Sequence, residues 1–221
     1  LLAREQKIAQ SQWQALKETF TQVQIDSLQR QAQSVSQLAD ELRLPLIEIG
    51  LPALKNLSRE QYLQFKNALA AFIRADGTVT ITEWSLFQII IHNLETRTAP
   101  GKLHSLEQLQ EKACVLLWAV ANVGEGSTDK ARIAFSAGSD LLGFSDATFL
   151  SPDEYGMEDL QSALKALTHL KPLQKPKLLK AISLCVLADQ HVSVAEAELF
   201  RAIADALDCP VPPMIQVGTP T

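Results

Sequence analysis

The strongest constraint on the fold of this chain is an internal repeat of forty residues. Shifting the sequence by 113 residues aligns residues 51–90 with residues 164–203 without a gap, and thirteen of the forty aligned pairs are identical. Other pairs exchange one apolar residue for another, such as Phe65 with Leu178 and Ile73 with Val186. Self-similarity at a fixed spacing is typical of a supersecondary unit that a chain uses more than once. The sequence therefore predicts two related structural units.

Both copies carry apolar residues at helical spacing, which places them on one face of a helix. These residues are Phe65, Leu69, Phe72 and Ile73 in the first copy, and Leu178, Ile182, Cys185 and Val186 in the second. Only 9 Gly and 10 Pro occur among 221 residues, which is too few turn formers for a β-sandwich or a barrel. The sequence therefore predicts an all-α fold in which two related helical hairpins pack together, with additional N-terminal helices.

The start of the first helix in each copy can be placed from local signals. Ser58 and Gln61 have the spacing of a capping box, in which each side chain binds a free backbone N–H group of the first turn. In the second copy, Pro172 and Pro176 are compatible with a helix only in its first turn. We therefore expect this second helix to begin close to Leu173.

An acidic loop follows the first helix of each copy, at residues 75–83 and 188–196. It reads Ala-Asp-Gly-Thr-Val-Thr-Ile-Thr-Glu in the first copy and Ala-Asp-Gln-His-Val-Ser-Val-Ala-Glu in the second. Asp-Gly favours a turn because Gly accepts positive φ and Asp accepts hydrogen bonds from nearby N–H groups. Thr80 with Glu83, and Ser193 with Glu196, repeat the capping-box spacing. The next helix is expected to begin one residue after Thr80 and one residue after Ser193.

We divide the chain into three segments on this basis. Residues 1–44 form a Gln-rich amphipathic segment of one long or two consecutive helices, residues 45–209 contain the duplicated helical domain, and residues 210–221 form an extended tail rich in proline. Further helices are expected at 45–56, 106–123 and 128–142, and loops at 95–104 and 144–156.

Composition and motifs exclude several classes of function for these residues. The chain has 20 Lys+Arg and 25 Asp+Glu, and a formal charge of −5 does not favour nucleic acid as a partner. Three widely spaced cysteines fit a reducing compartment better than a disulfide framework. No run of eighteen apolar residues, paired-histidine zinc motif, phosphate-binding glycine loop or nucleophile elbow is present. We expect no catalytic site and no cofactor within this chain.

The carboxylates of the two acidic loops are the candidate site residues. Asp76 with Glu83, and Asp189 with Glu196, could approach each other across a turn and offer oxygen ligands to a divalent cation such as Ca²⁺. An EF-hand distributes more oxygen ligands over twelve residues, so two carboxylates are few for such a site. We favour a structural interpretation in which Asp supports the turn and Glu caps the helix, with no metal bound.

Several other residues have a structural and a functional interpretation, and the structural one is favoured for each. Trp84 and Trp118 lie in apolar helical stretches and are expected in the core. Cys185 lies on the inward face of its helix, His191 is expected to be exposed, and Cys209 is expected to be accessible to solvent.

The loop pattern Ala-Asp-Gly-x-Val-x-x-x-Glu at residues 75–83, with its second form at 188–196, resembles the signature of TerB-like helical domains. The motifs at 44–48 (Leu-Pro-Leu-Ile-Glu), 51–55 (Leu-Pro-Ala-Leu-Lys), 57–58, 61–62 and 83–84 are similar to the C-terminal region of bacterial HtpX-like membrane zinc metallopeptidases. The ending at 202–210, followed by Pro212 and Pro213, resembles the close of that region. The resemblance covers most of residues 42–213, and the second loop departs from its pattern at Gln190 and His191.

This resemblance implies a parent protein with transmembrane helices and a zinc site upstream of Leu1. The present chain would be its non-catalytic module on the cytoplasmic face of the bacterial inner membrane, reaching the membrane only through the upstream segment and engaging a protein substrate or partner. An alternative is a stand-alone TerB-like stress-response module that binds a divalent cation through Asp76 and Glu83.

Overall fold

The computed structural model describes residues 5–95, 101–123, 127–144, 146–149, 155–209 and 211. Within these ranges the regular elements are ten α-helices and two short 3₁₀ helices, and the described residues contain no β-strand beyond an isolated bridge between His104 and Leu170. The prediction of an all-α fold is confirmed.

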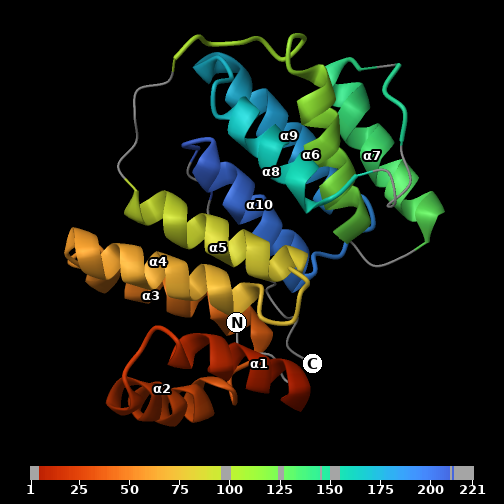
Figure 1. Cartoon of the computed structure of the whole chain (residues 1–221). Coiled ribbons are helices and arrows are strands. Elements are labelled where there is room, and N and C mark those ends of the chain that lie inside the picture. Colours follow the sequence, from red (N-terminus) through yellow and green to blue (C-terminus); the bar gives the residue numbers. More distant parts are fainter. Residues whose placement is uncertain are drawn as a thin grey trace. The chain divides into compact units, whose positions relative to one another are not determined.

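The chain forms two compact units, Leu1–Glu95 and Thr96–Thr221, which we call unit 1 and unit 2. Figure 1 shows the helices of each, coloured along the sequence. The first copy of the repeat lies in unit 1 and the second in unit 2. The segments expected at 1–44, 45–209 and 210–221 divide the chain differently, and that division stays a prediction.

Unit 1 is built from helices that bury an apolar core centred on α5. Its elements are α1 (Gln6–Lys17), α2 (Gln22–Val35), η1 (Asp40–Leu42), α3 (Arg43–Leu54), α4 (Arg59–Ile73) and α5 (Ile81–Leu94). Helix α5 packs on α3 and on α4, and α1 packs on α4 and on α2. Leu86 and Ile89 of α5 are fully buried, and Trp84 is buried as expected from the sequence.

The Gln-rich segment forms two helices, which settles the choice that the sequence left open. Thr21 begins α2, and its backbone N–H donates to Gln24 Oε1 over 2.9 Å. The Gln24 side chain therefore accepts a hydrogen bond from a backbone N–H at the start of α2. In one continuous helix, that N–H would instead donate to a backbone carbonyl one turn earlier. The interruption between α1 and α2 therefore rests on a polar cap, without Gly or Pro.

Unit 2 is organised around α6, whose sides contact four other helices. Its elements are α6 (Gln110–Val123), α7 (Thr128–Leu142), α8 (Met157–Leu167), η3 (Pro172–Gln174), α9 (Lys175–Val186) and α10 (Val194–Ala206). Leu116, Leu117 and Val120 of α6 are fully buried, and Trp118 is buried as well. Helix α6 packs on α7, α8, α9 and α10, and α7 also packs closely on α9.

The start of one helix differs from its predicted position, whereas the described parts of the two predicted loops agree with theirs. The helix expected from residue 106 begins at Gln110, because residues 106–109 form turns before it. The described parts of the expected loops, 95, 101–104, 144, 146–149 and 155–156, are not helical. The rest of those loops and the tail, apart from Val211, lie outside the described residues.

The duplication extends to three helices in each copy. Adding 113 to the bounds of α3, α4 and α5 gives 156–167, 172–186 and 194–207, whereas α8 spans 157–167, η3 with α9 spans 172–186 and α10 spans 194–206. The packing of the first helix differs between the copies, since α3 packs on α5 and α8 packs on α6. The secondary structure of the unit is repeated, and its tertiary surroundings are not.

Candidate functional site

The acidic loop of unit 1, which we call the first corner (residues 75–83), is closed by local hydrogen bonds. Asp76 Oδ1 accepts from the N–H of Thr78 over 3.1 Å, which forms the turn after α4. Glu83 Oε2 accepts from the N–H of Thr80 over 3.0 Å and from its hydroxyl over 2.8 Å. In return, Thr80 Oγ1 accepts from the N–H of Glu83 over 3.2 Å. Both carboxylates therefore have partners within their own loop.

The acidic loop of unit 2, the second corner (residues 188–196), repeats this geometry. Asp189 Oδ1 accepts from the N–H of His191 over 3.0 Å, and Glu196 Oε2 accepts from the N–H and the hydroxyl of Ser193, both over 2.8 Å. Ser193 Oγ accepts from the N–H of Glu196 over 3.2 Å. The two corners thus use equivalent residues for equivalent bonds, and the predicted capping boxes are confirmed.

Both corners also require a left-handed residue at the same position. Gly77 has φ of 84° and Gln190 has φ of 64°, and 77 + 113 gives 190. The left-handed region costs a residue with a side chain about 1–2 kcal/mol, whereas Gly enters it freely. The second corner therefore holds its turn despite an unfavourable residue.

These contacts define what the carboxylates can do. A cation bound at either corner would compete with hydrogen bonds that hold the turn and the first turn of the next helix. Among the described residues, no group of three or more His, Cys, Asp or Glu is arranged to hold a metal ion. Asp76, Glu83, Asp189 and Glu196 act as turn and cap residues in this structure, and their metal-binding alternative stays a hypothesis.

The second corner borders a pocket of about 330 Å³, which we call the corner pocket. Its polar lining combines the Asp189 and Glu196 carboxylates with Lys130 of α7. The rest of its lining is Cys185, Ile133 and the small residues Ala121, Ala131, Ala134 and Ala188. Sequence reasoning did not identify Lys130, because it lies in a different helix from the corner and carries no local motif.

Cys185, which lines this pocket, is a buried thiol that stays protonated at neutral pH. Its Sγ donates to the carbonyl of Ala134 over 3.1 Å, and burial raises the pKa of the thiol to about 12. Only the thiolate is a strong nucleophile, so a thiol of this pKa packs as a small apolar group. This agrees with the sequence-based interpretation of Cys185 as a core residue.

Unit 1 contains a larger groove, which we call the N-terminal groove, of about 530 Å³ between its first four α-helices. Its larger apolar lining residues are Trp13 and Leu16 from α1, Leu28 and Val35 from α2, Leu38, Leu46 from α3, and Phe72 from α4. Val35, Leu38 and Leu46 are 44, 39 and 40% exposed, so the groove presents apolar side chains to solvent. At its edge the guanidinium of Arg43 forms an ion pair with Asp40 over 2.6 Å.

The sequence pattern indicated the apolar faces of the first two helices but not the groove. The amphipathic series includes Leu16, Leu28 and Val35, which is the only local signal for it. The remaining lining comes from residues distant in sequence, whose juxtaposition depends on how α3 and α4 pack.

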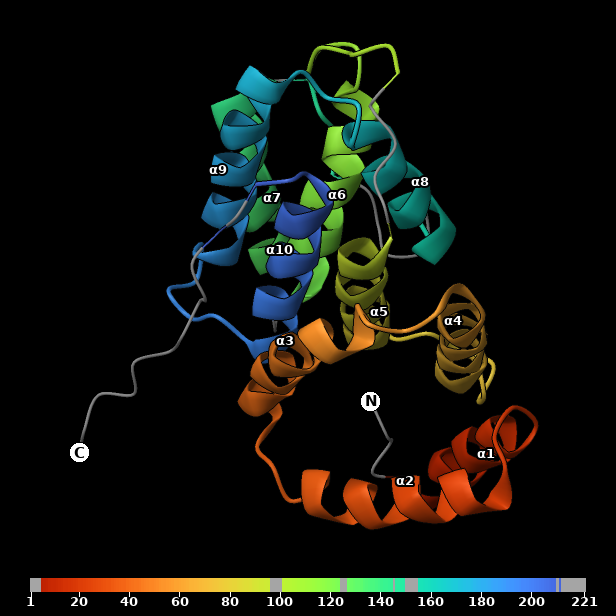
Figure 2. The same cartoon turned by 90° about the vertical axis from the view of Figure 1, so that its left-hand side faces the viewer.

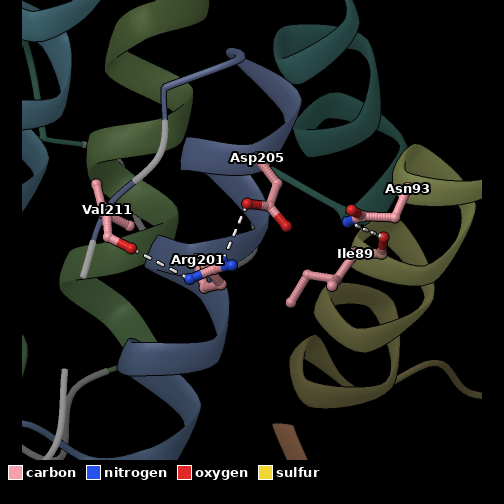
Figure 3. Close-up of polar contacts among 5 residues, drawn as sticks. All are labelled: Ile89, Asn93, Arg201, Asp205 and Val211. Carbon is pink, nitrogen blue, oxygen red and sulfur yellow. Dashed lines mark hydrogen bonds and ion pairs between the residues drawn. The ribbon is translucent and has the colours of Figure 1, made fainter. Parts of the chain in front are cut away.

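Polar contacts elsewhere hold the ends of helices. Lys66 Nζ and Tyr62 Oη both bind Glu95 Oε1, which ties α4 to the end of α5. The hydrogen bond from Lys66 lowers the pKa of Glu95 against the opposing effect of burial. Within α10, Arg201 Nε donates to Asp205 over 3.0 Å, and its Nη1 donates to the carbonyl of Val211, beyond the end of that helix, over 3.2 Å. Within α5, the amide of Asn93 donates to the carbonyl of Ile89 (Figure 3).

The other sequence-based expectations for single residues can also be placed. His191 is exposed, and Cys209 is of intermediate exposure. No helix among the described residues is both long enough and apolar enough to cross a bilayer. Searches of protein-family models, curated proteins and solved structures found no match to this chain.

Proposed function

We propose that this chain is a non-catalytic helical module that binds a protein through the N-terminal groove. The observation that carries the proposal is an apolar groove with three partly exposed aliphatic side chains and the Arg43–Asp40 ion pair at its edge. Grooves between helices of this kind accept the apolar face of a segment from another protein. The occupant that fits this chemistry is an apolar segment of an unfolded or partly unfolded protein substrate.

The resemblance of the sequence motifs supplies the biological setting of the proposal. In that setting, the chain is the cytoplasmic C-terminal module of a bacterial membrane-bound zinc metallopeptidase of the HtpX-like class. The zinc and the peptidase residues belong to the upstream part of the parent, and the module delivers substrate to it. The charge of −5 supports a protein partner over nucleic acid.

The groove can be tested with a matched pair of substitutions on the same helix. Val35 lines the groove, whereas Val23 lies on α2 outside the groove lining and is 78% exposed. We expect Val35→Glu to weaken binding of a permanently unfolded protein, reduced and carboxymethylated α-lactalbumin, by about tenfold or more, because a carboxylate would be desolvated in an apolar site. Val23→Glu should bind as the unsubstituted chain does, and titration calorimetry gives both affinities.

Two results would contradict the groove as the binding site. One is an unsubstituted chain that does not bind the unfolded protein, and the other is an equal loss of affinity in both variants. Circular dichroism spectra of the variants separate lost binding from lost fold.

The proposal that this chain belongs to a membrane-bound zinc metallopeptidase can be tested separately. The complete gene is expected to encode an H-E-x-x-H motif and apolar spans upstream of Leu1, since these supply zinc and membrane attachment. A complete reading frame without them would end the peptidase proposal while leaving the groove proposal intact.

A further inference from the structure

The longest stretch of the chain without an acidic residue runs from residue 160 to residue 188. It contains no Asp or Glu and five lysines, in a chain that has five more acidic than basic residues overall. It covers most of α8 and the whole of η3 and α9. Positive charge is therefore concentrated in one part of unit 2.

Helix α9 has an inner face that is buried and an outer face that is exposed. Leu178, Ile182 and Val186 are fully buried against the helices that pack on α9, which are α6, α7 and α10. Figure 2 shows α9 at the margin of the unit 2 helices, beside α7. The exposed residues at helical spacing, which we call the outer stripe, are Leu173, Lys177, Lys180, Leu184 and Leu187.

The leucine at the start of the outer stripe is almost fully exposed, while hydrogen bonds of the neighbouring residues hold its backbone in place. Leu173 is 94% exposed and lies in η3 between Pro172 and Gln174. Gln174 Oε1 accepts from the N–H of Leu106 over 2.8 Å, and the N–H of Lys171 donates to the carbonyl of His104 over 2.9 Å. The backbone therefore presents this side chain outward from a fixed base.

The duplication shows that the fold itself does not require this arrangement. Subtracting 113 from Lys171 and Leu173 gives Ser58, which caps α4 in the first copy by pairing with Gln61, and Glu60 in the first turn of that helix. The second copy replaces that polar cap with lysine, proline and an exposed leucine. Leu184 and Leu187, at 37 and 49% exposure, continue the apolar character along the same face.

We propose that the outer stripe of α9, together with Lys171 and Lys175, docks on the surface of an anionic lipid bilayer. The leucines enter the boundary between headgroups and acyl chains, and the lysine amines contact lipid phosphates while their stems lie along the apolar boundary. A bilayer surface can accept an exposed helix face of this composition without a complementary pocket. This surface is independent of the N-terminal groove and adds a direct contact to the attachment that the proposed parent would provide.

Charge and composition favour a bilayer over the other occupants. A second copy meeting this face across a two-fold axis would bring lysines against lysines. Single-stranded nucleic acid would call for aromatic or arginine side chains on which bases stack, and the outer stripe has neither.

The lysines of this face differ in their surroundings. Lys177 and Lys171 are close enough to Glu107 to interact with its carboxylate electrostatically, and Lys177 Nζ also donates to the carbonyl of Leu142 over 3.2 Å. Lys171 and Lys180 are both exposed.

Vesicle sedimentation tests the proposal with the whole chain. We expect binding to vesicles of phosphatidylcholine mixed with phosphatidylglycerol, weak binding to phosphatidylcholine alone, and release at about 1 M salt, where charges are screened within about 3 Å. Leu173→Ser should lower the partition coefficient about tenfold. Lys171→Gln with Lys180→Gln should lower it about 30-fold, because each lysine near an anionic surface contributes to binding.

Matched controls separate this face from nonspecific attraction. Val23→Ser removes a side chain that is 78% exposed in unit 1, and Lys17→Gln with Lys55→Gln removes the same charge from exposed positions there. Both controls should bind vesicles as the unsubstituted chain does. The proposal would be overturned by equal loss in the controls, by equal binding to both kinds of vesicle, or by binding to a DNA duplex without binding to vesicles.

Discussion

At the scale of single residues, the two corners provide a natural comparison of one backbone position with two side chains. Gly77 and Gln190 occupy the same left-handed position, and a Cβ at Gly77 would meet no atom within 4 Å. The two residues therefore differ in the steric cost of this shared backbone conformation, and not in the space available to a side chain. The next residue in each corner, Thr78 or His191, donates its backbone N–H to the Asp of the same corner, although the two side chains differ.

Exchanging these residues should have opposite effects on stability. We expect Gln190→Gly to raise the free energy of unfolding by about 0.5–1 kcal/mol and Gly77→Ala to lower it by about 1 kcal/mol, because only glycine adopts positive φ without a steric cost. Urea denaturation measures both. Loss of stability in Gln190→Gly would show that the Gln side chain contributes more than its backbone costs.

The buried thiol of Cys185 should make unit 2 sensitive to alkaline pH. Its pKa is raised above the value of about 9 that the unfolded chain would have, so its contribution is fully present below pH 9 and is lost as pH rises toward 12. Unfolding free energies measured at pH 7 and pH 10 should differ more for the unsubstituted chain than for Cys185→Ala, by about 1 kcal/mol. An equal pH dependence in both would contradict the buried-thiol account.

At the scale of helices, the packing of α7 on α9 depends on the absence of a side chain at Gly138. A Cβ there would lie 2.6 Å from Cys185 Sγ and 2.7 Å from Leu117 Cδ2. Gly50, inside α3, provides the contrasting case because a Cβ would meet no atom within 4 Å. The same substitution is therefore a test of packing at one site and of helix propensity at the other.

We expect Gly138→Ala to destabilise the protein by about 1–3 kcal/mol, since the helices must move apart to admit a methyl group. Gly50→Ala should stabilise it by about 0.5–1 kcal/mol, because alanine is the better helix former. Thermal unfolding of the two variants gives the comparison. A stable Gly138→Ala variant would mean that α7 and α9 adapt more readily than their close contact indicates.

Much of the helical structure could be predicted because it is encoded locally. Ser58, Thr80 and Ser193 each begin a helix where the capping-box spacing placed it, and α7 has the predicted bounds. The cap at Thr21 went unrecognised, which left one helix or two in the Gln-rich segment. The start of α6 at Gln110 depends on the turns at residues 106–109 that precede it, which helical periodicity does not specify.

At the scale of the whole chain, the duplication could be predicted and the surroundings of each copy could not. Identity at thirteen aligned positions fixes which residues form the corners and the inner faces. The N-terminal groove and the corner pocket depend on helices outside the repeat, as Trp13 and Lys130 show. Such sites arise from packing between distant segments, which no periodicity within one segment specifies.

The repeated carboxylates hold turns and helix starts, and we propose on this basis that they serve the scaffold and do not bind a metal ion. Titration calorimetry with Ca²⁺ and with Zn²⁺, on the unsubstituted chain and on Asp76→Ala, tests it most directly. The account predicts no binding heat that depends on Asp76, together with a loss of about 1 kcal/mol of stability in the variant whether or not a cation is present. Saturable heat that disappears in Asp76→Ala would contradict it and favour a divalent-cation site.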